Sequence, residues 1–518
     1  LHRVFQNFPL EKTYNWELKT LKKCLQQADV DDVDALLAAS DATERRALAA
    51  VVLVEQAPGV SESVRSDALA HTLTALGLAW PTTLYEQFLL EGRASRRGRR
   101  EGGRESLPRL DEEVLSALDV ALDQELSSRD IVTAVSRAID PTHSSARATT
   151  FRLWSASTLA RAGEGEGALA LLRRSLIAGL DPEVAARCLE LVEQLEALAI
   201  IEQEHVRVEL LLLRARALFA LGDHDADQVL DAAGTPDASA PLPLRFAYHE
   251  MRLIALLGRG QFSEAKAIGS CLEEMLDEAP TRELRARIHA GLARLNIHTK
   301  NYPGAVEHAG RGRALCEELD EPLIELSVRN MYAIALQESG EHGAAEPQLE
   351  RCYNLAKTLG SSRFQVMTLN SLGDLALRRK RWSDARRWLR EGLEVGQQSY
   401  PLAAYLHGNL AWAALNEEDA DVALEHIEEA LSRLADEPSI VRAYLIELEQ
   451  YALAMLNMAS AWDACMTRLE AMLDHIDAAH EEGVIGARAS ARLWEARGEK
   501  ERAERALAVA TQLASAFE

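Results

Sequence analysis

The chain of 518 residues is poor in aromatic residues, which make up 5% of it, and runs of β-branched residues are few. The residue types that favour β-strands are therefore scarce. No stretch of about 18 consecutive apolar residues occurs, so no membrane-spanning helix is expected. The first residues, Leu1–Phe5, lack the charged and apolar zones of a secretory signal peptide, and no initiator Met precedes them.

The motifs that mark common enzyme classes are also missing. No Gly-Lys dipeptide occurs, which excludes a P-loop, and no His-Glu-x-x-His, Cys-x-x-Cys or Gly-x-Ser-x-Gly is present. The glycines over 163–167 follow a predicted helix rather than a strand, unlike a dinucleotide loop. The aspartates over 223–227 lack the glycine and glutamate of a calcium loop, because Gln228 and Gly234 stand at those positions. We therefore expect no catalytic residue, metal site or cofactor, and no enzyme.

The spacing of the cysteines and the net charge indicate which compartment and which kinds of partner to expect. The cysteines are scattered without metal-ligand spacing and mostly fall on apolar helical positions, where a reduced thiol acts as a small hydrophobe: they are Cys24, Cys188, Cys271, Cys316, Cys352 and Cys465. A reducing cytoplasm fits this usage best. The formal net charge of −24 repels a phosphate backbone, so nucleic acid is not an expected partner.

What the chain does contain is a helix-forming composition with a repeat. Apolar residues make up 47%, carried by Ala and Leu, which with Glu and Arg are strong helix formers. A turn followed by a small residue recurs in steps of 38 to 42 residues. The small residues are Ala265, Ala305, Ala345, Ala385, Ala423, Cys465 in a looser copy at 462–465, and Ala503. The fold class is all-α.

Amphipathic segments flank each turn. Leu369, Leu372 and Ala376 precede one turn, and Ala385 and Leu389 follow it, at spacings that place each set on one helical face. Glycine or alanine at such positions lets two helices approach closely. The pattern therefore predicts helical hairpins that bury their apolar faces only by stacking.

One unit resembles the tetratricopeptide repeat (TPR) family throughout its length. It runs from Leu372-Gly373 through Trp382 and Ala385 to Gly392-Leu393, and the unit around Asn409-Leu410-Ala411 is similar. The step near 40 resembles long-helix variants in kinesin light chains, G-protein-regulator scaffolds and the sensor arms of bacterial signalling ATPases. The resemblance covers roughly 150–518 and is strongest from 285 to 432. It implies a right-handed superhelical solenoid.

Three regions are predicted. Residues 1–92 form a helical bundle or an atypical cap, 93–109 a mobile loop, and 110–518 the repeat array. The loop is rich in glycine and carries Arg93, Arg96, Arg97, Arg99, Arg100 and Arg104. It is a solvated linker in the simplest interpretation. The functional alternatives are contact with RNA or an anionic surface, docking of an acidic partner, or cleavage by a trypsin-like protease.

The resemblance also implies where a partner binds, because the first helix of each TPR hairpin lines the concave face. The corresponding positions here are Arg216, Arg287, Arg294, His298, Asn330, Gln337, Asn370, Asp374, Arg378, Tyr405, Trp412 and Asn416. They do not reproduce the Lys and Asn set with which some TPR chaperone adaptors hold a terminal carboxylate. The arginines gather positive charge on the wall of an acidic protein, and Trp412 and Tyr405 offer flat apolar anchors.

These observations favour an interaction scaffold or regulator in the cytoplasm, whose groove binds a peptide or helix of a signalling protein. Two alternatives stay open. The chain is the C-terminal sensor arm of a larger bacterial signalling ATPase or kinase, which the missing Met favours, or a regulator controlled by proteolysis at the arginine-rich loop. The sequence indicates neither the partner nor the oligomeric state.

Overall fold

The computed structural model describes residues 42–57, isolated positions between 68 and 135, residues 146–175 and 182–198, and residues 204–515 with short gaps. No strand occurs within these ranges, and the all-α prediction is confirmed. The predicted loop at 93–109 with its six arginines lies outside the described residues, as does Cys24. In the described part no helix is long and apolar enough to cross a membrane.

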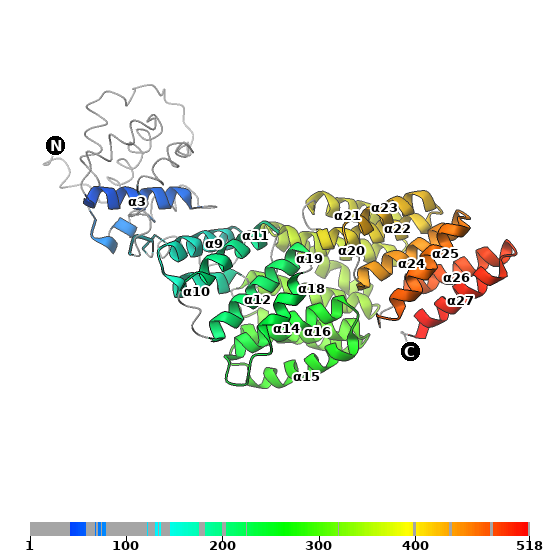
Figure 1. The fold of residues 1–518 in the computed structure, drawn as a ribbon, viewed down its shortest axis with the longest axis horizontal. Coiled ribbons are helices and arrows are strands. Elements are labelled where there is room, and N and C mark those ends of the chain that lie inside the picture. The colour runs from blue at the N-terminus through cyan, green and yellow to red at the C-terminus, as the bar shows by residue number, and fades with distance from the viewer. Residues whose placement is uncertain are drawn as a thin grey trace, which may run out of the picture. The chain divides into compact units, whose positions relative to one another are not determined.

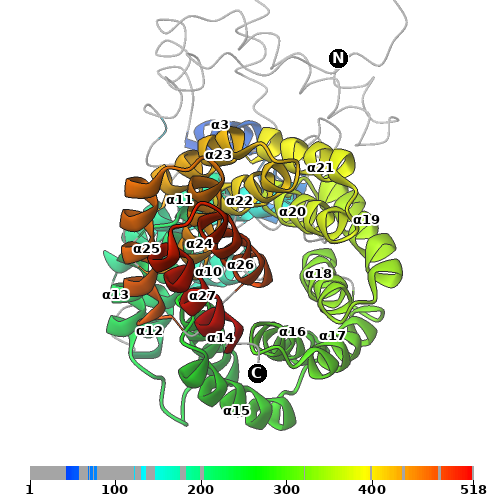
Figure 2. The ribbon, with the colours of Figure 1, turned by 90° about the vertical axis from the view of Figure 1, so that its right-hand side faces the viewer.

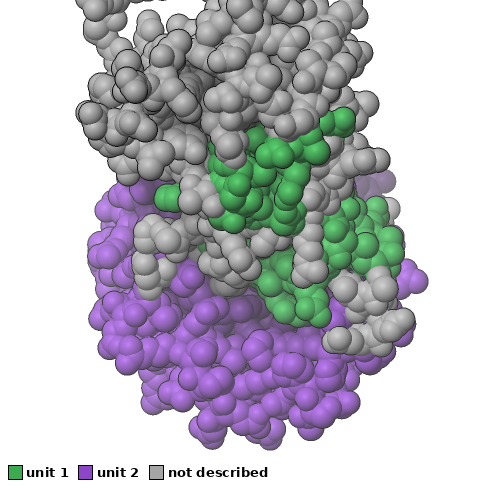
Figure 3. All heavy atoms as spheres, turned by 90° about the vertical axis from the view of Figure 1, so that its left-hand side faces the viewer, with its two compact units in different colours: residues 1–175, 193–200 green, residues 176–192, 201–518 purple. Residues whose placement is uncertain are grey.

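The chain divides into two compact units, coloured in Figure 3. Unit 1 comprises residues 1–175 and 193–200, and unit 2 comprises 176–192 and 201–518. The helices, labelled in Figure 1, are α3 (Ala42–Gln56), α9 (Ala146–Arg161), α10 (Gly165–Ser175), α11 (Pro182–Glu196), α12 (Glu204–Leu221), α13 (Asp225–Ala233), α14 (Leu242–Gly258), α15 (Phe262–Glu278), α16 (Arg282–His298), α17 (Tyr302–Cys316), α18 (Pro322–Glu338), α19 (His342–Leu359), α20 (Ser362–Arg378), α21 (Trp382–Val395), α22 (Tyr400–Asn416), α23 (Ala420–Ser432), α24 (Ile440–Met455), α25 (Ala459–Leu473), α26 (Glu481–Ala496) and α27 (Lys500–Ser515).

Within unit 1, α9 and α10 form a helical hairpin. Its turn is the glycine-rich segment that superficially resembles a dinucleotide loop, and Gly163 there has φ +78°. The backbone N–H of Glu164 donates to the carbonyl of Leu159 at 2.8 Å, which closes the end of α9. The interpretation of this segment as a repeat turn is confirmed. The predicted region boundaries at 92 and 109 stay predictions.

In unit 2, consecutive helices from α12 to α27 pair into hairpins whose short turns share one geometry. One residue of each turn takes positive φ: Gly222, Gly260, Lys300, Gly340, Lys380, Glu418, Asn457 and Gly498. The next N–H then bonds back to the preceding helix, as from Gln261 to the carbonyl of Leu256 at 2.9 Å. This left-handed closure satisfies carbonyls at the helix end. It recurs at the predicted breaks with one exception.

The exception lies between α24 and α25. The predicted position of the looser copy, Trp462–Cys465, is wrong by three residues: the turn residue with positive φ is Asn457, which stands five before Trp462 as Gly260 stands five before Ala265. Trp462 stands three residues after the start of its helix, where the other hairpins have alanines such as Ala265 and Ala305. Trp462 is 0% exposed and packs edge-on against Trp494, with ring centroids 5.4 Å apart. A large residue at a small-residue position hid this turn.

The hairpins of unit 2 stack into a superhelix. The first helices of successive hairpins, α14, α16, α18, α20, α22 and α24, pack against one another, and Figure 2 shows them on the inner side with α15, α17, α19, α21, α23 and α25 outside. Small residues permit close packing within and between hairpins. A Cβ at Gly373 would lie 2.5 Å from the Leu389 side chain of the second helix α21, and one at Gly408 of α22 would lie 2.8 Å from the Tyr444 ring of α24. The inner wall is therefore built from first helices.

The superhelix returns to itself within unit 2. Phe262, at the start of α15, packs against the core of the last two hairpins, which includes Trp462 and Trp494. Beside this contact lies a cavity of about 670 Å³, the cross-turn cavity. It is lined by residues of early and late hairpins: Phe262, Ile297, His298, Lys300, Tyr302, Glu338, Arg378, Tyr405, Ile440, His480, Glu481, Glu482, Val484, Ile485, Arg488 and Ala514.

Two hairpins carry a histidine pair at equivalent positions, each made of one buried and one half-buried histidine. His289 and His308 approach with their Nδ1 atoms 3.1 Å apart, and His407 and His426 do so at 3.2 Å. Such a contact requires at least one neutral imidazole, because two protonated rings have no acceptor to offer. Burial, then the partner histidine, lowers the pKa of His289 and of His407 to about 4.

We expect replacement of Trp462 by Ala to destabilise the last two hairpins by about 3–5 kcal/mol, because it leaves a cavity beneath Trp494. Neighbouring repeats couple only through their interfaces. Hydrogen exchange should therefore show lost protection in α24–α27 and unchanged protection in α16–α19. The half-buried Trp388 provides the control, since its replacement by Ala should have a smaller effect. Uniform loss across the array would contradict this account.

The histidine pairs predict acid sensitivity. Each low-pKa histidine is neutral in the fold, whereas the unfolded chain binds a proton below about pH 6.5. Their contribution to stability is therefore complete above pH 6.5 and is lost as pH falls towards 4. The melting temperature of the His289→Gln, His407→Gln variant should fall less than that of the wild type between pH 7 and pH 4.5. Parallel curves for the two proteins would refute this role.

Candidate partner-binding site

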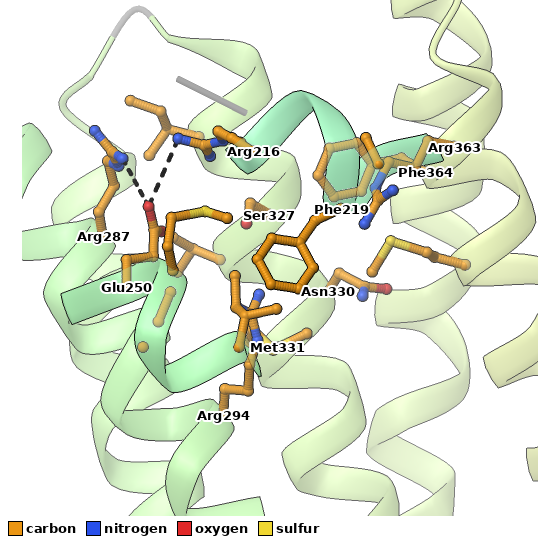
Figure 4. A pocket seen from close by; sticks show the side chains of 18 residues that line it. Arg216, Phe219, Glu250, Arg287, Arg294, Ser327, Asn330, Met331, Arg363 and Phe364 are labelled. Atoms are coloured by element: carbon orange, nitrogen blue, oxygen red, sulfur yellow. Dashed lines mark hydrogen bonds and ion pairs between the residues drawn. The ribbon is translucent and has the colours of Figure 1, made fainter. Parts of the chain in front are cut away.

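Five first helices of unit 2, α12, α14, α16, α18 and α20, enclose a pocket of about 170 Å³, the arginine pocket (Figure 4). Each contributes residues from one face, because positions three or four apart share a helical face. The lining consists of Arg216, Phe219, Ala220, Glu250, Met251, Ile254, Arg287, Ala290, Gly291, Arg294, Ile324, Ser327, Val328, Asn330, Met331, Arg363, Phe364 and Met367.

The charged part of the arginine pocket centres on one carboxylate. Oε2 of Glu250 lies 3.0 Å from Nη2 of Arg287 and 3.7 Å from Nη1 of Arg216. Figure 4 shows the two arginines reaching this oxygen from α16 and α12. The Arg287 guanidinium also lies over the ring of Phe246, 4.9 Å from its centroid, which holds it in place.

Arg294 adds a third cation to this group. Among the described residues it makes no hydrogen bond or ion pair, and its interaction with Glu250 is at longer range. Burial lowers the pKa of Arg294, and burial together with Arg287 and Arg294 lowers that of Arg216 despite Glu250. Burial works against the charged form of Glu250, but the three arginines prevail and hold its pKa below the usual value. The lowered pKa of Glu250 keeps this carboxylate ionised at neutral pH, and guanidinium groups are protonated in proteins.

Asn330 presents an unpaired amide to the same pocket. Its side chain is 0% exposed, yet neither Nδ2 nor Oδ1 has a hydrogen-bond partner. Leaving such a buried group unpaired costs about 1–3 kcal/mol. A donor and an acceptor lie side by side on this amide, which is the arrangement that a peptide group complements.

The remaining wall is apolar. Phe219, Met331 and Phe364 surround the space next to Asn330 in Figure 4. Methionine and aromatic side chains offer adaptable, polarisable surface to a ligand. Arg363 stands at the same edge and has an interaction of its own. The pocket thus combines a cationic end, one unpaired amide and apolar walls.

The structure brings Arg216, Arg287, Arg294 and Asn330 of the predicted groove together in the arginine pocket. It places His298, Arg378 and Tyr405 in the cross-turn cavity. There Arg378 pairs with Glu338 at 2.9 Å and with Asp374 at 3.1 Å. Burial raises the pKa of Glu338 to about 7, although Arg378 opposes the shift.

The other predicted residues mostly bind their neighbours. Gln337 donates to Asp374, and Asn370 accepts a hydrogen bond from Asn409 at 3.0 Å. Trp412 packs partly buried between two core clusters, and Asn416 donates to its carbonyl at 2.8 Å. These contacts join successive first helices. Their role as groove residues stays a proposal.

Several residues of the arginine pocket were not predicted from the sequence. Glu250 was missed because no groove position was assigned within α14, although positions on α12 and α16 on either side of it were. Arg363, Phe364 and Met367 lie at the start of α20, one turn or more before the positions considered. A signal was present: Glu250 lies ten residues before the turn residue Gly260, and Arg287 lies thirteen before Lys300. Positions three apart share a helical face, so both side chains belong to the same face of successive first helices.

Two chemical features remain in the described part of the chain, clusters of metal-binding side chains and cysteine thiols. No group of three or more His, Cys, Asp or Glu residues is placed to hold a metal ion there. The five cysteines that the structure describes are unpaired, and burial raises the pKa of Cys188 and Cys352 to about 12. Those two thiols are therefore protonated and poorly nucleophilic. The arrangement is suited to binding.

Comparison with known proteins agrees with this architecture. The model of the tetratricopeptide repeat matches residues 324–398, which include α18–α21. No curated protein matches the chain. The structure of Rap protein complexed with competence and sporulation factor is 15% identical, covers 71% of this chain and 99% of its own, and has a TM-score of 0.50.

Two further structures are similar at lower scores. NprR in complex with its cognate peptide NprX is 14% identical, with 68% of this chain and 99% of that chain covered and a TM-score of 0.47. A signal transduction ATPase with a tetratricopeptide repeat sensor from Pyrococcus horikoshii is 13% identical, with 86% and 71% covered and a TM-score of 0.42. At such identities the likeness concerns the fold alone. Residues 324–398 thus match the tetratricopeptide repeat, and the described helices of unit 2 stack as a superhelical solenoid of hairpins.

Proposed function

We propose that the chain binds a segment of another protein, a peptide or helix, on the inner wall of its superhelix, with an anionic group of that segment in the arginine pocket. One observation carries the proposal: Arg216, Arg287 and Arg294 share the single carboxylate of Glu250. Half-buried cations without matching anions are costly, because protein surroundings solvate charge less well than water. A ligand anion removes that cost.

The neighbouring groups support a peptide as the ligand. Asn330 has an unpaired donor and acceptor for a backbone amide, and Phe219 and Phe364 provide surface for an apolar side chain. A buried polar group that pairs only on binding adds specificity, since ligands without the complementary group leave it unsatisfied. An acidic residue next to an apolar residue therefore describes the expected segment.

The rest of the groove extends this surface along the first helices. Gln337, Asp374 and Asn370 continue from α18 to α20, and Trp412 lies on α22. We propose that these side chains contact the flanks of the bound segment, while His298, Arg378 and Tyr405 contact what enters the cross-turn cavity. Side chains that already bond to their neighbours are pre-organised, which lowers the entropy lost on binding.

The fold is compatible with this role. Rap protein, whose fold this chain shares at a TM-score of 0.50, is complexed with competence and sporulation factor in its structure. The proposal applies whether the chain acts alone as a cytoplasmic regulator or as the sensor arm of a larger signalling ATPase or kinase. It concerns binding and includes no catalytic step.

Charge reversal at the arginine pocket tests the proposal. Short random peptides displayed on phage are selected against the immobilised full chain. We expect acidic residues beside apolar ones in the recovered sequences, and at least tenfold weaker binding to the Arg287→Glu, Arg294→Glu variant. The Arg311→Glu, Arg387→Glu variant changes net charge equally at exposed sites on second helices and should bind normally. Equal binding to the two variants, with circular dichroism showing intact helices, would place the ligand elsewhere.

The Glu250→Gln variant should strengthen peptide binding and at the same time lower the stability of the fold. The change frees the three arginines from their internal anion, so a selected acidic peptide should bind several-fold more tightly. The free energy of unfolding should fall by about 1–3 kcal/mol, because the half-buried arginines lose their partner. Glu307→Gln, which removes an exposed pair with Arg311, is the control. Weaker peptide binding to Glu250→Gln would show that Glu250 orders the site rather than competing for it.

A further inference from the structure

We infer that the anion held by the arginine pocket is a dianion, the phosphate of a phosphorylated side chain. This inference rests on the proposed function, since it names the ligand group for the same pocket. It starts from charge balance. Arg216, Arg287 and Arg294 bring three positive charges and Glu250 one negative charge, which leaves a surplus of two. Arg363 is left out of this balance because it has an interaction of its own.

A carboxylate would neutralise only half of that surplus. A phosphorylated side chain carries a charge of about −1.5 to −2 at pH 7 and matches it. The mismatch matters here because these arginines are only partly solvated: the side chains of Arg216 and Arg287 are 19% and 17% exposed. In such surroundings charges interact more strongly with one another than at an open surface. A ligand that neutralises both surplus positive charges is therefore favoured over one that neutralises a single charge.

The hydrogen-bond balance leads to the same ligand. Each guanidinium has five N–H donors, and this group of three has one carboxylate to receive them. Nε of Arg287 is buried without an acceptor, and so is Nδ2 of Asn330. Arg294 has no hydrogen bond among the described residues. A phosphate offers three strong acceptor oxygens where a carboxylate offers two.

The size of the pocket limits what enters with the phosphate. A volume of about 170 Å³ equals the bulk volume of only about five or six water molecules. That space accepts a phosphoryl group and part of one side chain, and the flanking peptide must lie along the inner wall. Phe219 and Phe364 then contact the apolar stem of the modified residue.

A nucleic-acid strand fits the arginine pocket less well than a phosphorylated side chain does. The chain has a net charge of −24, and in the cross-turn cavity three glutamates are matched by three basic residues, so this cavity has no surplus of positive charge: Glu338, Glu481 and Glu482 against Lys300, Arg378 and Arg488. A strand would bring further phosphates against these carboxylates, whereas a single phosphorylated residue brings one. Charge complementarity is confined to one pocket, which favours an isolated dianion on a protein segment.

Degenerate peptide libraries test the inference directly on the full chain. Their central residue is fixed as phosphoserine, phosphothreonine or phosphotyrosine, as the unmodified residue, or as Glu. At least one phosphorylated library should bind at least tenfold more tightly than the Glu library, measured by fluorescence anisotropy. Arg294→Gln should reduce this binding at least tenfold. The variant should fold, because Arg294 has no ion pair to lose, and Arg311→Gln is the matched control at an exposed site.

The pH dependence gives an independent readout. Phosphate loses its second charge near pH 6, so phosphopeptide binding should weaken several-fold from pH 7.5 to pH 5.5. The protein groups facing the pocket hold their charge in this range. Guanidinium groups are protonated throughout this range, and Glu250 has a lowered pKa. Cys188, with a pKa of about 12, interacts with Arg216, and His298 of the cross-turn cavity, with a pKa of about 4, interacts with Arg294.

The outcomes separate this inference from the proposed function. If the Glu library binds as tightly as the phosphorylated ones, the inference of a dianion is wrong. The proposed binding of a protein segment through an anionic group then still stands. If no library binds, the proposed function fails as well. Displacement of bound phosphopeptide by single-stranded DNA of random sequence at equal phosphate concentration would indicate a polyanion site and overturn the inference. Tighter phosphopeptide binding that is lost with Arg294→Gln and resists DNA supports it.

Discussion

Every part of unit 2 depends on one constraint: a helical hairpin has an apolar face that only another hairpin can cover. Two helices of about 16 residues cannot enclose a core, so burial comes from stacking. First helices contact one another closely, as at Gly408 of α22, where an added Cβ would meet Tyr444 of α24, and this lets the inner side be narrower than the outer. Curvature follows, and with it an inner wall to which successive helices contribute side chains. The arginine pocket exists because five such helices converge there.

The same constraint explains how an acidic chain builds a cationic pocket. The apolar core residues hold each helix in place, and the residues on its inward face do not take part in this packing. Those inward positions can therefore carry charged side chains. Arg216 lies on α12, and Arg287 and Arg294 lie on α16, so these cations meet only through stacking. Glu250 on α14, between them, keeps them together without neutralising them all. Buried, incompletely paired polar groups are tolerated where function requires them. Asn330, unpaired in both amide atoms, fits that pattern.

The sequence predicts the fold well because its signals are local. Turns with a left-handed residue, small residues after them and helical periodicity define hairpins at Gly260, Lys300, Gly340, Lys380, Glu418 and Gly498. The turn at Asn457 was misplaced because Trp462 fills a small-residue position, and only its contact with Trp494 shows how that is accommodated. For the site, the resemblance indicated the arginines and Asn330. It did not indicate Glu250, Phe364 or the return of the superhelix onto α15, since these depend on how many repeats complete a turn.

The central claim is that the partner binds inside the superhelix at the arginine pocket. A structure of the full chain with its tightest selected peptide tests this most directly. The account predicts that an anionic group of the peptide lies within hydrogen-bond distance of Arg287 and Arg294, with a backbone amide on Asn330. A peptide bound to the outer second helices, with these three side chains arranged as before, would contradict it.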